Sequence, residues 1–400
     1  MFKNPLHEEF ATWALGFAPY GGADVGEVAA IAGAVGDGDD DAFYAAWRAE
    51  ADRLASEGKD AETAGHAMSA REFYLHAACS YAVAYHPIYG VPVDPRLVES
   101  FHAQIAVFDA AMRLSEPPIE AVSIPYEHTT MPAYLIRARG RERDSRPLLI
   151  GTNGYDATVT EMYFAFAVAA AARGYHCLFF DGPGQGKLLI DDGMPMRADW
   201  ENVVSPVVDI ALGLDGVDQD RIALTGWSLG GYLALRAASA DHRLAACIAD
   251  PGSDGIWAEF LGMAKVGGMP QEVIDALPDA DDATLQALLA GIESSPHAKW
   301  GVLQRGFWVN GADNLGDWLK AVEPFALGPR AADIRCPTLL TAAENDALAK
   351  GVPAIYATLT CPKTLLRFTA AEGAGDHCEM LNRSLLNRRV FDWLDGVLGV

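Results

Sequence analysis

The stretch Arg221-Ile-Ala-Leu-Thr-Gly-Trp-Ser-Leu-Gly-Gly231 decides the fold of this chain. Its apolar run, Ile222 to Leu224, is typical of a buried strand, and the residues from Tyr232 to Ala240 favour a helix. Between them lies Gly226-Trp-Ser-Leu-Gly230, which matches the G-x-S-x-G pattern of a sharp strand-to-helix turn that exposes a serine. Glycine at both ends of the turn removes side chains that would clash across it. We therefore predict that Ser228 is a nucleophile.

Short apolar runs alternate with helix-length segments on both sides of this turn. Two early runs, Ala121 to Tyr126 and Met131 to Ile136, are typical of a hairpin. The alternation predicts an α/β fold with a mostly parallel central sheet that is covered on both faces. The later strand-like runs are Leu148 to Ile150, Tyr175 to Phe180, Ile222 to Leu224, Leu244 to Ala249, Thr338 to Thr341 and Thr364 to Phe368.

Two regions of the chain depart from this alternation. Residues 1–115 carry helix-period apolar patterns and predict an N-terminal helical domain. Residues 254–330 spread large apolar side chains through helix-like sequence and predict a helical cap insertion. The α/β core then comprises residues 116–253 and 331–400. A chain of 400 residues, half of them apolar, is long enough for this organisation.

The chain is strongly acidic, with 30 basic against 54 acidic residues and a formal net charge of −24. Such a charge repels phosphate backbones and anionic membrane surfaces, so we expect neither nucleic acid nor a membrane as a partner. The first residues include acids where a signal peptide needs an apolar segment, and no run approaches the roughly eighteen apolar residues of a membrane span. The six cysteines include no C-x-x-C pair, which indicates reduced thiols. We expect a cytoplasmic protein.

A serine hydroxyl needs a base to become a nucleophile, and the base needs a carboxylate that orients it. The stretch Gly373-Ala-Gly-Asp-His377 follows the last predicted strand, and the chain order serine, acid, histidine is that of an α/β-hydrolase. We therefore predict His377 as the base; the alternative is a loop histidine that caps the final helix. The histidines form no H-E-x-x-H or H-x-x-x-H pair, so we expect no metal and no cofactor.

The predicted acid is Asp346, at the end of the penultimate strand in Leu339-Leu-Thr-Ala-Ala-Glu-Asn-Asp346. Its neighbour Glu344 is the less favoured carboxylate of the same segment. The next rival is Asp250, which ends the strand after the serine turn and is more simply explained as a cap of the first insertion helix or as a residue that shapes the cleft.

Backbone N–H groups must bind the negative charge that develops on a carbonyl oxygen under attack. One is expected from Leu229, directly after the nucleophile, and the other from Tyr155 in the loop Gly151-Thr-Asn-Gly-Tyr-Asp156. An ordinary strand-to-helix loop is the alternative there. A second glycine-rich stretch, Asp181-Gly-Pro-Gly-Gln-Gly186, lacks the G-K-[ST] ending of a phosphate loop, so we interpret it as a turn at the sheet edge.

With Gly154-Tyr-Asp156 and Asp181-Gly-Pro-Gly-Gln-Gly186 both ahead of the serine turn, the chain resembles the family of FrsA-like esterases and 2,6-dihydroxypseudooxynicotine hydrolase-like enzymes, and it is similar to fungal heptaketide hydrolases. The resemblance covers roughly residues 40–400. It implies a carbon-carbon bond hydrolase or an esterase, a substrate held between the helical domain and the core, and a homodimer.

The resemblance also implies a role for Glu259, which lies about thirty positions after the nucleophile, as an acid that polarises the substrate. A capping or solvated glutamate on the first insertion helix is the alternative. The chain departs from the family at Thr158-Val-Thr-Glu161, where many members have a Lys-Glu pair.

These observations together predict a serine hydrolase that cleaves a carbon-carbon bond of an aromatic or polyketide-like ketone, of the 1,3-diketone type, through an acyl-enzyme. The alternatives are a carboxylesterase or acyltransferase that acts on an aromatic ester, and a non-catalytic ligand-binding protein. Aromatic side chains that could face a substrate are also typical of packing. These candidates are Tyr74, Tyr81, Tyr85, His86 and Tyr89 in the N-terminal region and Trp257 in the insertion.

Overall fold

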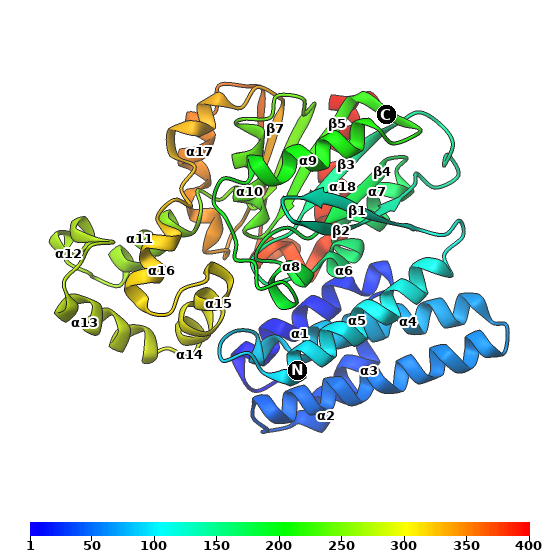
Figure 1. Cartoon of the computed structure of the whole chain (residues 1–400), viewed down its shortest axis with the longest axis horizontal. Helices are drawn as coiled ribbons and strands as arrows, with labels where there is room; N and C mark the ends of the chain where they lie inside the picture. Colours follow the sequence, from blue (N-terminus) through cyan, green and yellow to red (C-terminus); the bar gives the residue numbers. More distant parts are fainter.

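The computed structural model describes residues 1–400 and has an eight-stranded sheet at its centre (Figure 1). The strand order is β1-β2-β4-β3-β5-β6-β7-β8. β2 pairs antiparallel with both β1 and β4, whereas every other neighbouring pair is parallel. The predicted α/β fold with a mostly parallel sheet is therefore confirmed. The strands are β1 (Glu120–Tyr126), β2 (Thr129–Ile136), β3 (Arg146–Thr152), β4 (His176–Phe180), β5 (Val217–Trp227), β6 (Ala246–Asp250), β7 (Thr338–Ala343) and β8 (Lys363–Phe368).

Both faces of the central strands are buried, because their successive side chains enter different cores. In β3, Leu149 belongs to one apolar cluster, whereas Leu148 and Ile150 belong to the other. A strand that buries both of its faces is a continuous apolar run in sequence, which explains the short runs that predicted the sheet. The helices that cover the core are α6 (Val159–Met162), α7 (Val168–Ala172), α8 (Gly186–Ile190), α9 (Glu201–Leu212), α10 (Gly230–Ala238), α17 (Val352–Thr358) and α18 (Arg383–Leu398).

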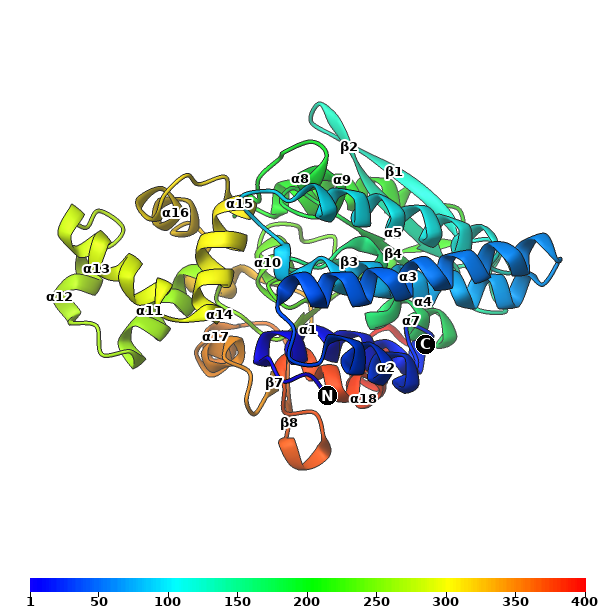
Figure 2. The same ribbon diagram turned by 90° about the horizontal axis from the view of Figure 1, so that it is seen from below.

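Five helices precede the sheet and share the apolar cluster on its Leu149 side. Figure 1 shows them along the lower side of the molecule, and Figure 2, seen from below, shows them side by side across the near face. The first of these helices packs directly against the segment His377–Asn382, where a side-chain carbon on Gly16 would lie 2.4 Å from the carbonyl oxygen of Met380. The five helices are α1 (Pro5–Phe17), α2 (Val25–Val35), α3 (Asp40–Thr63), α4 (Ala67–Ala84) and α5 (Pro95–Arg113).

A second group of helices lies between β6 and β7 in the chain and extends to the left in Figure 1. It has a small apolar cluster of its own, which includes Phe260, Trp318 and Leu319. No helix of the chain combines the length and the apolarity that a membrane span requires. The inserted helices are α11 (Ile256–Val266), α12 (Gln271–Ala276), α13 (Asp282–Glu293), α14 (Pro296–Ala298), α15 (Phe307–Asn310) and α16 (Leu315–Val322), with a π-helical segment at Lys299–Gly306.

Candidate active site

The turn that carries Ser228 is a strained strand-to-helix elbow. β5 ends at Trp227, Ser228 has a φ of +60°, and α10 begins at Gly230. A non-glycine residue in this left-handed region stores strain, which is typical of functional positions. A Cβ atom on Gly226 would lie 1.7 Å from the carbonyl oxygen of Gly230, so only glycine fits there. The elbow therefore follows from local sterics, and it leaves Ser228 partly accessible at the carboxyl end of β5.

The structure brings Ser228, His377 and Asp346 into one chain of hydrogen bonds. Oγ of Ser228 lies 2.9 Å from Nε2 of His377, although 149 residues separate them. On the other side of the ring, Nδ1 of His377 lies 2.9 Å from Oδ2 of Asp346. Asp346 follows β7 and His377 follows β8, so the three side chains meet at the carboxyl ends of parallel strands. This is the geometry in which an imidazole takes a proton from a serine while a carboxylate fixes its tautomer.

The two rival carboxylates have other partners. Asp250 accepts hydrogen bonds from the Thr341 hydroxyl at 2.9 Å and from Nη1 of Arg383 at 2.7 Å. Glu344 accepts the backbone N–H of Ala370 at 2.8 Å. Neither carboxylate bonds His377. Asp250 does not cap α11, whose N-cap is Gly255, and its carboxylate is buried in an ion pair with Arg383.

The electrostatics favour a charged imidazolium. Burial opposes the charge on His377, but the adjacent Cys378 and Asp346 more than offset burial, and the pKa of His377 rises well above its ordinary value of 6.5. Burial raises the pKa of the adjacent Cys378 thiol to about 12, so this thiol is uncharged at neutral pH and Asp346 is the anion that matters. Burial also opposes the charge of Asp346, yet the nearby His377 holds the pKa of that carboxyl below its usual range.

Two backbone N–H groups beside Ser228 are available for an oxyanion. No protein acceptor takes the N–H of Leu229 or of Tyr155. The loop that carries Tyr155 approaches the elbow closely, since a Cβ on Gly154 would lie 2.9 Å from the carbonyl oxygen of Trp227 and 3.4 Å from the nitrogen of Leu229. The N–H of Gly154 is already used, because it donates to Oδ1 of Asn153 at 2.7 Å. The arrangement has the form of an oxyanion hole made by Leu229 and Tyr155.

The stretch Asp181–Gly186 is a turn, as predicted, but its predicted place at the sheet edge is wrong. It follows β4, which lies between β2 and β3 inside the sheet. Nε2 of Gln185 donates to the carbonyl oxygens of Asn153 at 2.9 Å and Gly154 at 2.8 Å, and Nδ2 of Asn153 donates to Oδ1 of Asp181 at 3.1 Å. This stretch therefore holds the loop of residues 151–156, which we call the oxyanion loop, through hydrogen bonds to Asn153 and Gly154. Its signal in the sequence was an acid and an amide within a glycine turn directly after a buried strand.

Glu259 lies in the first turn of α11, where its carboxylate accepts a hydrogen bond from the Ser253 hydroxyl. Burial raises the pKa of Glu259 to about 7, against the effect of this hydrogen bond. The nearby Asp346 carboxylate raises this pKa further, and His377 lowers it. Glu259 is therefore within electrostatic reach of both residues and carries a proton for a substantial part of the time at neutral pH.

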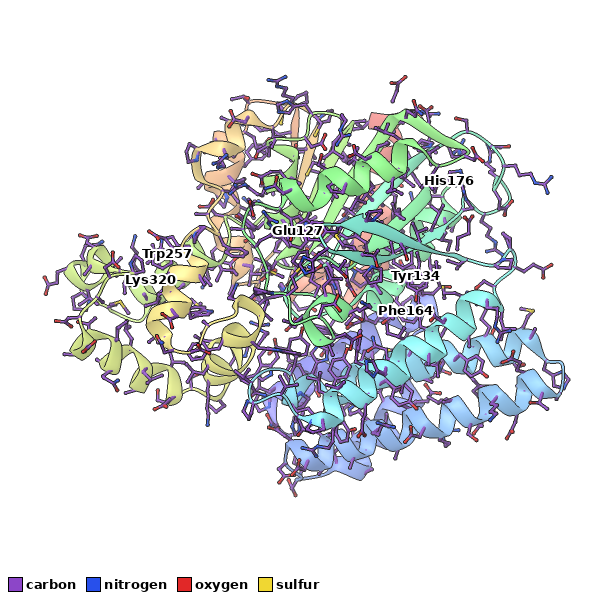
Figure 3. The ribbon with its side chains drawn as sticks, viewed as in Figure 1. Glu127, Tyr134, Phe164, His176, Trp257 and Lys320 are labelled. Atoms are coloured by element: carbon purple, nitrogen blue, oxygen red, sulfur yellow. The ribbon has the colours of Figure 1, made fainter.

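The aromatic candidates have different surroundings. The hydroxyls of Tyr74 and Tyr81 donate to Glu62 and Asp52, so these two side chains pack within the N-terminal helices. Tyr85 donates to Gln104, and Trp257 stacks on Phe260 within the insertion, where Figure 3 shows it. The His86 and Tyr89 rings are fully buried, 6.3 Å apart. The structure places none of these side chains in hydrogen-bond contact with Ser228, His377 or Asp346.

One aromatic residue near the elbow was missed. The ring of Trp13, on α1, lies 5.6 Å from that of Trp227 and 4.6 Å from that of His86. Trp13 is partly exposed, unlike the fully buried His86. Helix period alone assigns Trp13 to an apolar face, and no signal in the sequence shows that this face meets Trp227.

Tyr155 also contacts the insertion through its side chain. Burial raises the pKa of the Tyr155 hydroxyl to about 12, so it is a proton donor at neutral pH, and it donates to Oδ1 of Asn310. Next to it, Asp156 accepts a hydrogen bond from Nη1 of Arg305 at 2.6 Å. The side chains of the oxyanion loop thus point into the inserted helices.

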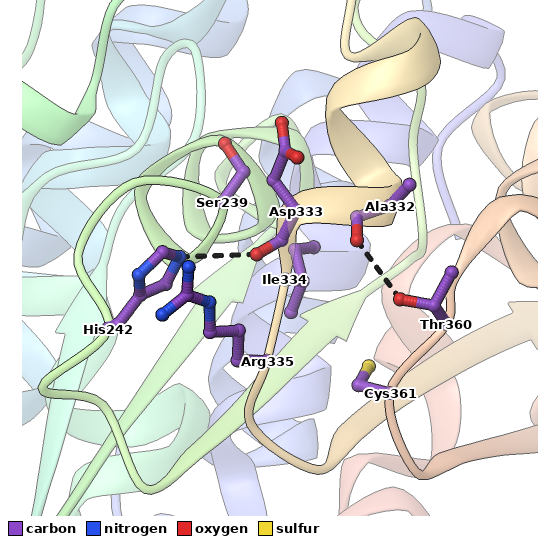
Figure 4. A pocket seen from close by; sticks show the side chains of 8 residues that line it. All are labelled: Ser239, His242, Ala332, Asp333, Ile334, Arg335, Thr360 and Cys361. Atoms are coloured by element: carbon purple, nitrogen blue, oxygen red, sulfur yellow. Dashed lines mark hydrogen bonds between the residues drawn. The ribbon is translucent and has the colours of Figure 1, made fainter.

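Two other features of the surface lie apart from this site. Asp24, Glu27 and His76 have metal-ligand chemistry and lie close together, but the Glu27 carboxylate already caps α2 through the N–H of Asp24. A hollow of about 530 Å³ lies where Ser239 and His242 face the segments that lead into β7 and β8 (Figure 4). That hollow is at the amino ends of these strands, opposite to Ser228, and none of the candidate site residues lines it.

Comparisons with known proteins agree with this fold. Residues 149–388 match the model of the alpha/beta hydrolase family. The chain is 31% identical to the 20-hydroxy-prefusarin hydrolase FUS2 of Gibberella moniliformis, over 96% of this chain and 95% of that protein. It is 31% identical to the hydrolase acrC of Aspergillus aculeatus, over 98% and 96% of the two chains. The crystal structure of 2,6-dihydroxy-pseudo-oxynicotine hydrolase superposes with a TM-score of 0.75 at 22% identity, over 96% of this chain and 95% of that one. The strand-elbow-helix turn and the sheet fit these matches, and the matches show that the chain belongs to the alpha/beta hydrolase family.

Proposed function

We propose that this hydrolase cleaves a carbon-carbon bond of an aromatic or polyketide-like ketone, of the 1,3-diketone type, through an acyl-enzyme on Ser228. The observation that carries the proposal is the position of Glu259. In ester cleavage the histidine returns the serine proton to the leaving oxygen, whereas an enolate leaving group must be protonated on carbon, a step that a second acid beside the histidine assists. Glu259 supplies a partly protonated carboxyl group within electrostatic reach of His377 and Asp346.

In the first step, Oγ of Ser228 forms a bond to one ketone carbon while Nε2 of His377 takes the hydroxyl proton. The 2.9 Å separation of these atoms already allows the transfer. Asp346 stabilises the resulting imidazolium. The carbonyl oxygen becomes an oxyanion, and the N–H groups of Leu229 and Tyr155 donate to it.

In the second step, the oxyanion collapses and the carbon-carbon bond breaks. The electron pair leaves as an enolate, which the second carbonyl of a 1,3-diketone stabilises. Protonation on carbon makes the departure irreversible. The proton comes either directly from the His377 imidazolium or from Glu259, whose carboxylate then takes up the proton of the His377 imidazolium, so that His377 is neutral again. Water then attacks the acyl-enzyme with His377 as base, so that one water is consumed and a carboxylic acid and a ketone are released.

One comparison bears on the substrate. FUS2, which is 31% identical over almost the whole chain, is named as a hydrolase of 20-hydroxy-prefusarin. The partner that we propose is a small aromatic molecule, as the sequence predicts. The homodimer expected from the resemblance stays a prediction.

The test compares wild type with Ser228→Ala on paired aromatic esters and 1,3-diketones, with products separated by mass. Cleavage of diketones by wild type alone supports the proposal. Cleavage of esters alone makes the protein a carboxylesterase, and products that partition to an added alcohol indicate an acyltransferase. If Ser228→Ala changes the products of neither the esters nor the diketones, the proposal fails and the result favours a non-catalytic ligand-binding protein.

A further inference from the structure

The oxyanion loop is held from two sides by different parts of the chain. From the core, Gln185 binds the carbonyl oxygens of Asn153 and Gly154, and Nδ2 of Asn153 donates to the carbonyl oxygen of Ala157. These bonds hold residues 153, 154 and 157. They do not hold the two residues between them, Tyr155 and Asp156.

The insertion holds those two residues. The Tyr155 hydroxyl donates to Asn310, at the end of α15, and Asp156 forms an ion pair with Arg305 at 2.6 Å. The guanidinium carbon of Arg305 also lies 4.8 Å from the centre of the Tyr155 ring and 4.4 Å from that of Trp300. Asp156 is almost fully buried and Arg305 is largely so, which strengthens the ion pair relative to an exposed one.

The part of the insertion that carries Arg305 is itself anchored to the N-terminal helical region. Nε2 of Gln304 donates to the carbonyl oxygen of Pro87 at 2.9 Å, and the N–H of Val91 donates to that of Gln304 at 3.0 Å. Nε1 of Trp300 donates to the carbonyl oxygen of His86 at 3.0 Å. Residues 86–91 therefore contact the segment 300–305, and this segment in turn contacts the loop beside Ser228.

We propose that the helical insertion positions the oxyanion donor of Tyr155, with Asn310 and Arg305 as positioning residues. The N–H of Tyr155 is effective only if it points at the developing oxyanion, because a hydrogen bond weakens steeply as its angle falls. The side chain of Tyr155 and its neighbour Asp156 set that direction, and both are held by the insertion rather than by the core. The inference rests on the proposed function only in taking Ser228 as the nucleophile; it does not depend on carbon-carbon cleavage.

The test uses a fluorophosphonate probe on the full-length protein. Oγ of Ser228 forms a bond to phosphorus, fluoride leaves with its electron pair, His377 takes the hydroxyl proton, and the phosphonyl oxygen occupies the oxyanion position. The rate of labelling at Ser228 is measured across pH. The plateau of the labelling rate at high pH measures how well the nucleophile and the oxyanion hole react with the probe. The midpoint of the pH profile measures the protonation of His377.

We expect Tyr155→Phe, Asn310→Leu and Arg305→Met each to lower the plateau rate by about tenfold to a hundredfold. This loss should not exceed the loss of rate that removal of a complete oxyanion-hole donor causes. The midpoint should not move, because the His377–Asp346 bond is untouched. Tyr155→Phe and Asn310→Leu remove the same hydrogen bond, so the double variant should be no slower than the slower single variant. Arg305→Lys should recover part of the rate.

Lys320→Met is the matched control, because Lys320 lies exposed on the same insertion (Figure 3) and faces only Asp279, at 3.7 Å. It should label at the wild-type rate. Melting temperatures of all variants exclude misfolding, and Arg305→Lys replaces Arg305→Met if the latter does not fold. Variants that label at the wild-type rate, or that move the midpoint, overturn the inference. A wild type that labels at Ser228 but cleaves no diketone overturns the proposed substrate class and leaves this inference standing.

Discussion

Nη1 of Arg383 lies 2.7 Å from Oδ2 of Asp250, in an ion pair beneath the elbow whose side chains are only 2% and 5% exposed. The backbone oxygen of Asp250 accepts the N–H of Ser228 at 2.7 Å. Arg383 also donates to the carbonyl oxygen of Cys378 at 2.7 Å, directly after His377. One buried ion pair thus joins the segment that carries the serine to the segment that carries the histidine.

Arg383→Met should lower the free energy of unfolding by about 3–5 kcal/mol, because it leaves the Asp250 carboxylate buried without its cation. Urea unfolding monitored by tryptophan fluorescence measures the change. The control is Lys3→Met, whose ammonium is exposed on the surface and whose replacement should change the free energy of unfolding by less than about 0.5 kcal/mol. Equal effects of the two substitutions would show that the ion pair does not stabilise the fold.

The rate of Ser228-dependent hydrolysis should fall as the pH decreases, with a midpoint above 6.5. His377 acts as a base only when neutral, and its raised pKa keeps it protonated to a higher pH than an ordinary histidine. Asp346→Asn removes the anion that favours the imidazolium, so the midpoint should move down while kcat falls by about 10³–10⁴-fold. Profiles of kcat and of kcat/KM against pH test both effects.

Glu344→Gln is the matched control for Asp346→Asn, because this carboxylate follows the same strand but accepts a backbone N–H and does not touch His377. Its midpoint should equal that of wild type. A shift with Glu344→Gln as large as with Asp346→Asn would contradict the assignment of the acid.

Glu259→Gln should slow the cleavage of 1,3-diketones much more than the cleavage of esters. Cleavage of a 1,3-diketone should slow by about 10²–10⁴-fold, since the amide cannot donate a proton to the leaving carbanion, whereas ester cleavage should change little. In wild type, diketone cleavage should also fall as the pH rises through about 7, where Glu259 loses its proton. Glu272→Gln, on the exposed surface of the insertion, is the control. Parallel losses in ester and diketone cleavage would leave Glu259 without a role in proton donation.

Gly226→Ala should destabilise the protein by about 3 kcal/mol or more and abolish labelling of Ser228, because the new Cβ would lie 1.7 Å from the backbone oxygen of Gly230. Gly262→Ala makes the same chemical change within α11, where no atom lies within 4 Å of the new Cβ. That substitution should stabilise the protein by about 0.5–1 kcal/mol. Urea unfolding and fluorophosphonate labelling of the two variants measure the difference.

The features that could be predicted from the sequence depend on neighbours in the chain. The elbow is a steric property of Gly226 and Gly230, and the strands around it are continuous apolar runs. Ser228, Asp346 and His377 were predicted from their order and from the place of each after a strand. Parallel strands bring their carboxyl ends to one edge, and the structure brings these three side chains together there.

The features that could not be predicted depend on strand order and on packing between distant segments. The stretch from Asp181 to Gly186 was assigned to the sheet edge because its sequence does not show that β4 lies between β2 and β3. Neither the ring contact of Trp13 with Trp227 nor the ion pair of Arg305 with Asp156 has a local signature. By itself, the sequence determined the nucleophile's turn and the layered α/β architecture, because steric clashes and apolar periodicity act over a few residues. Only the tertiary structure decided which side chains support the oxyanion loop, because those contacts exist only after segments about 30 to 150 residues apart have packed together.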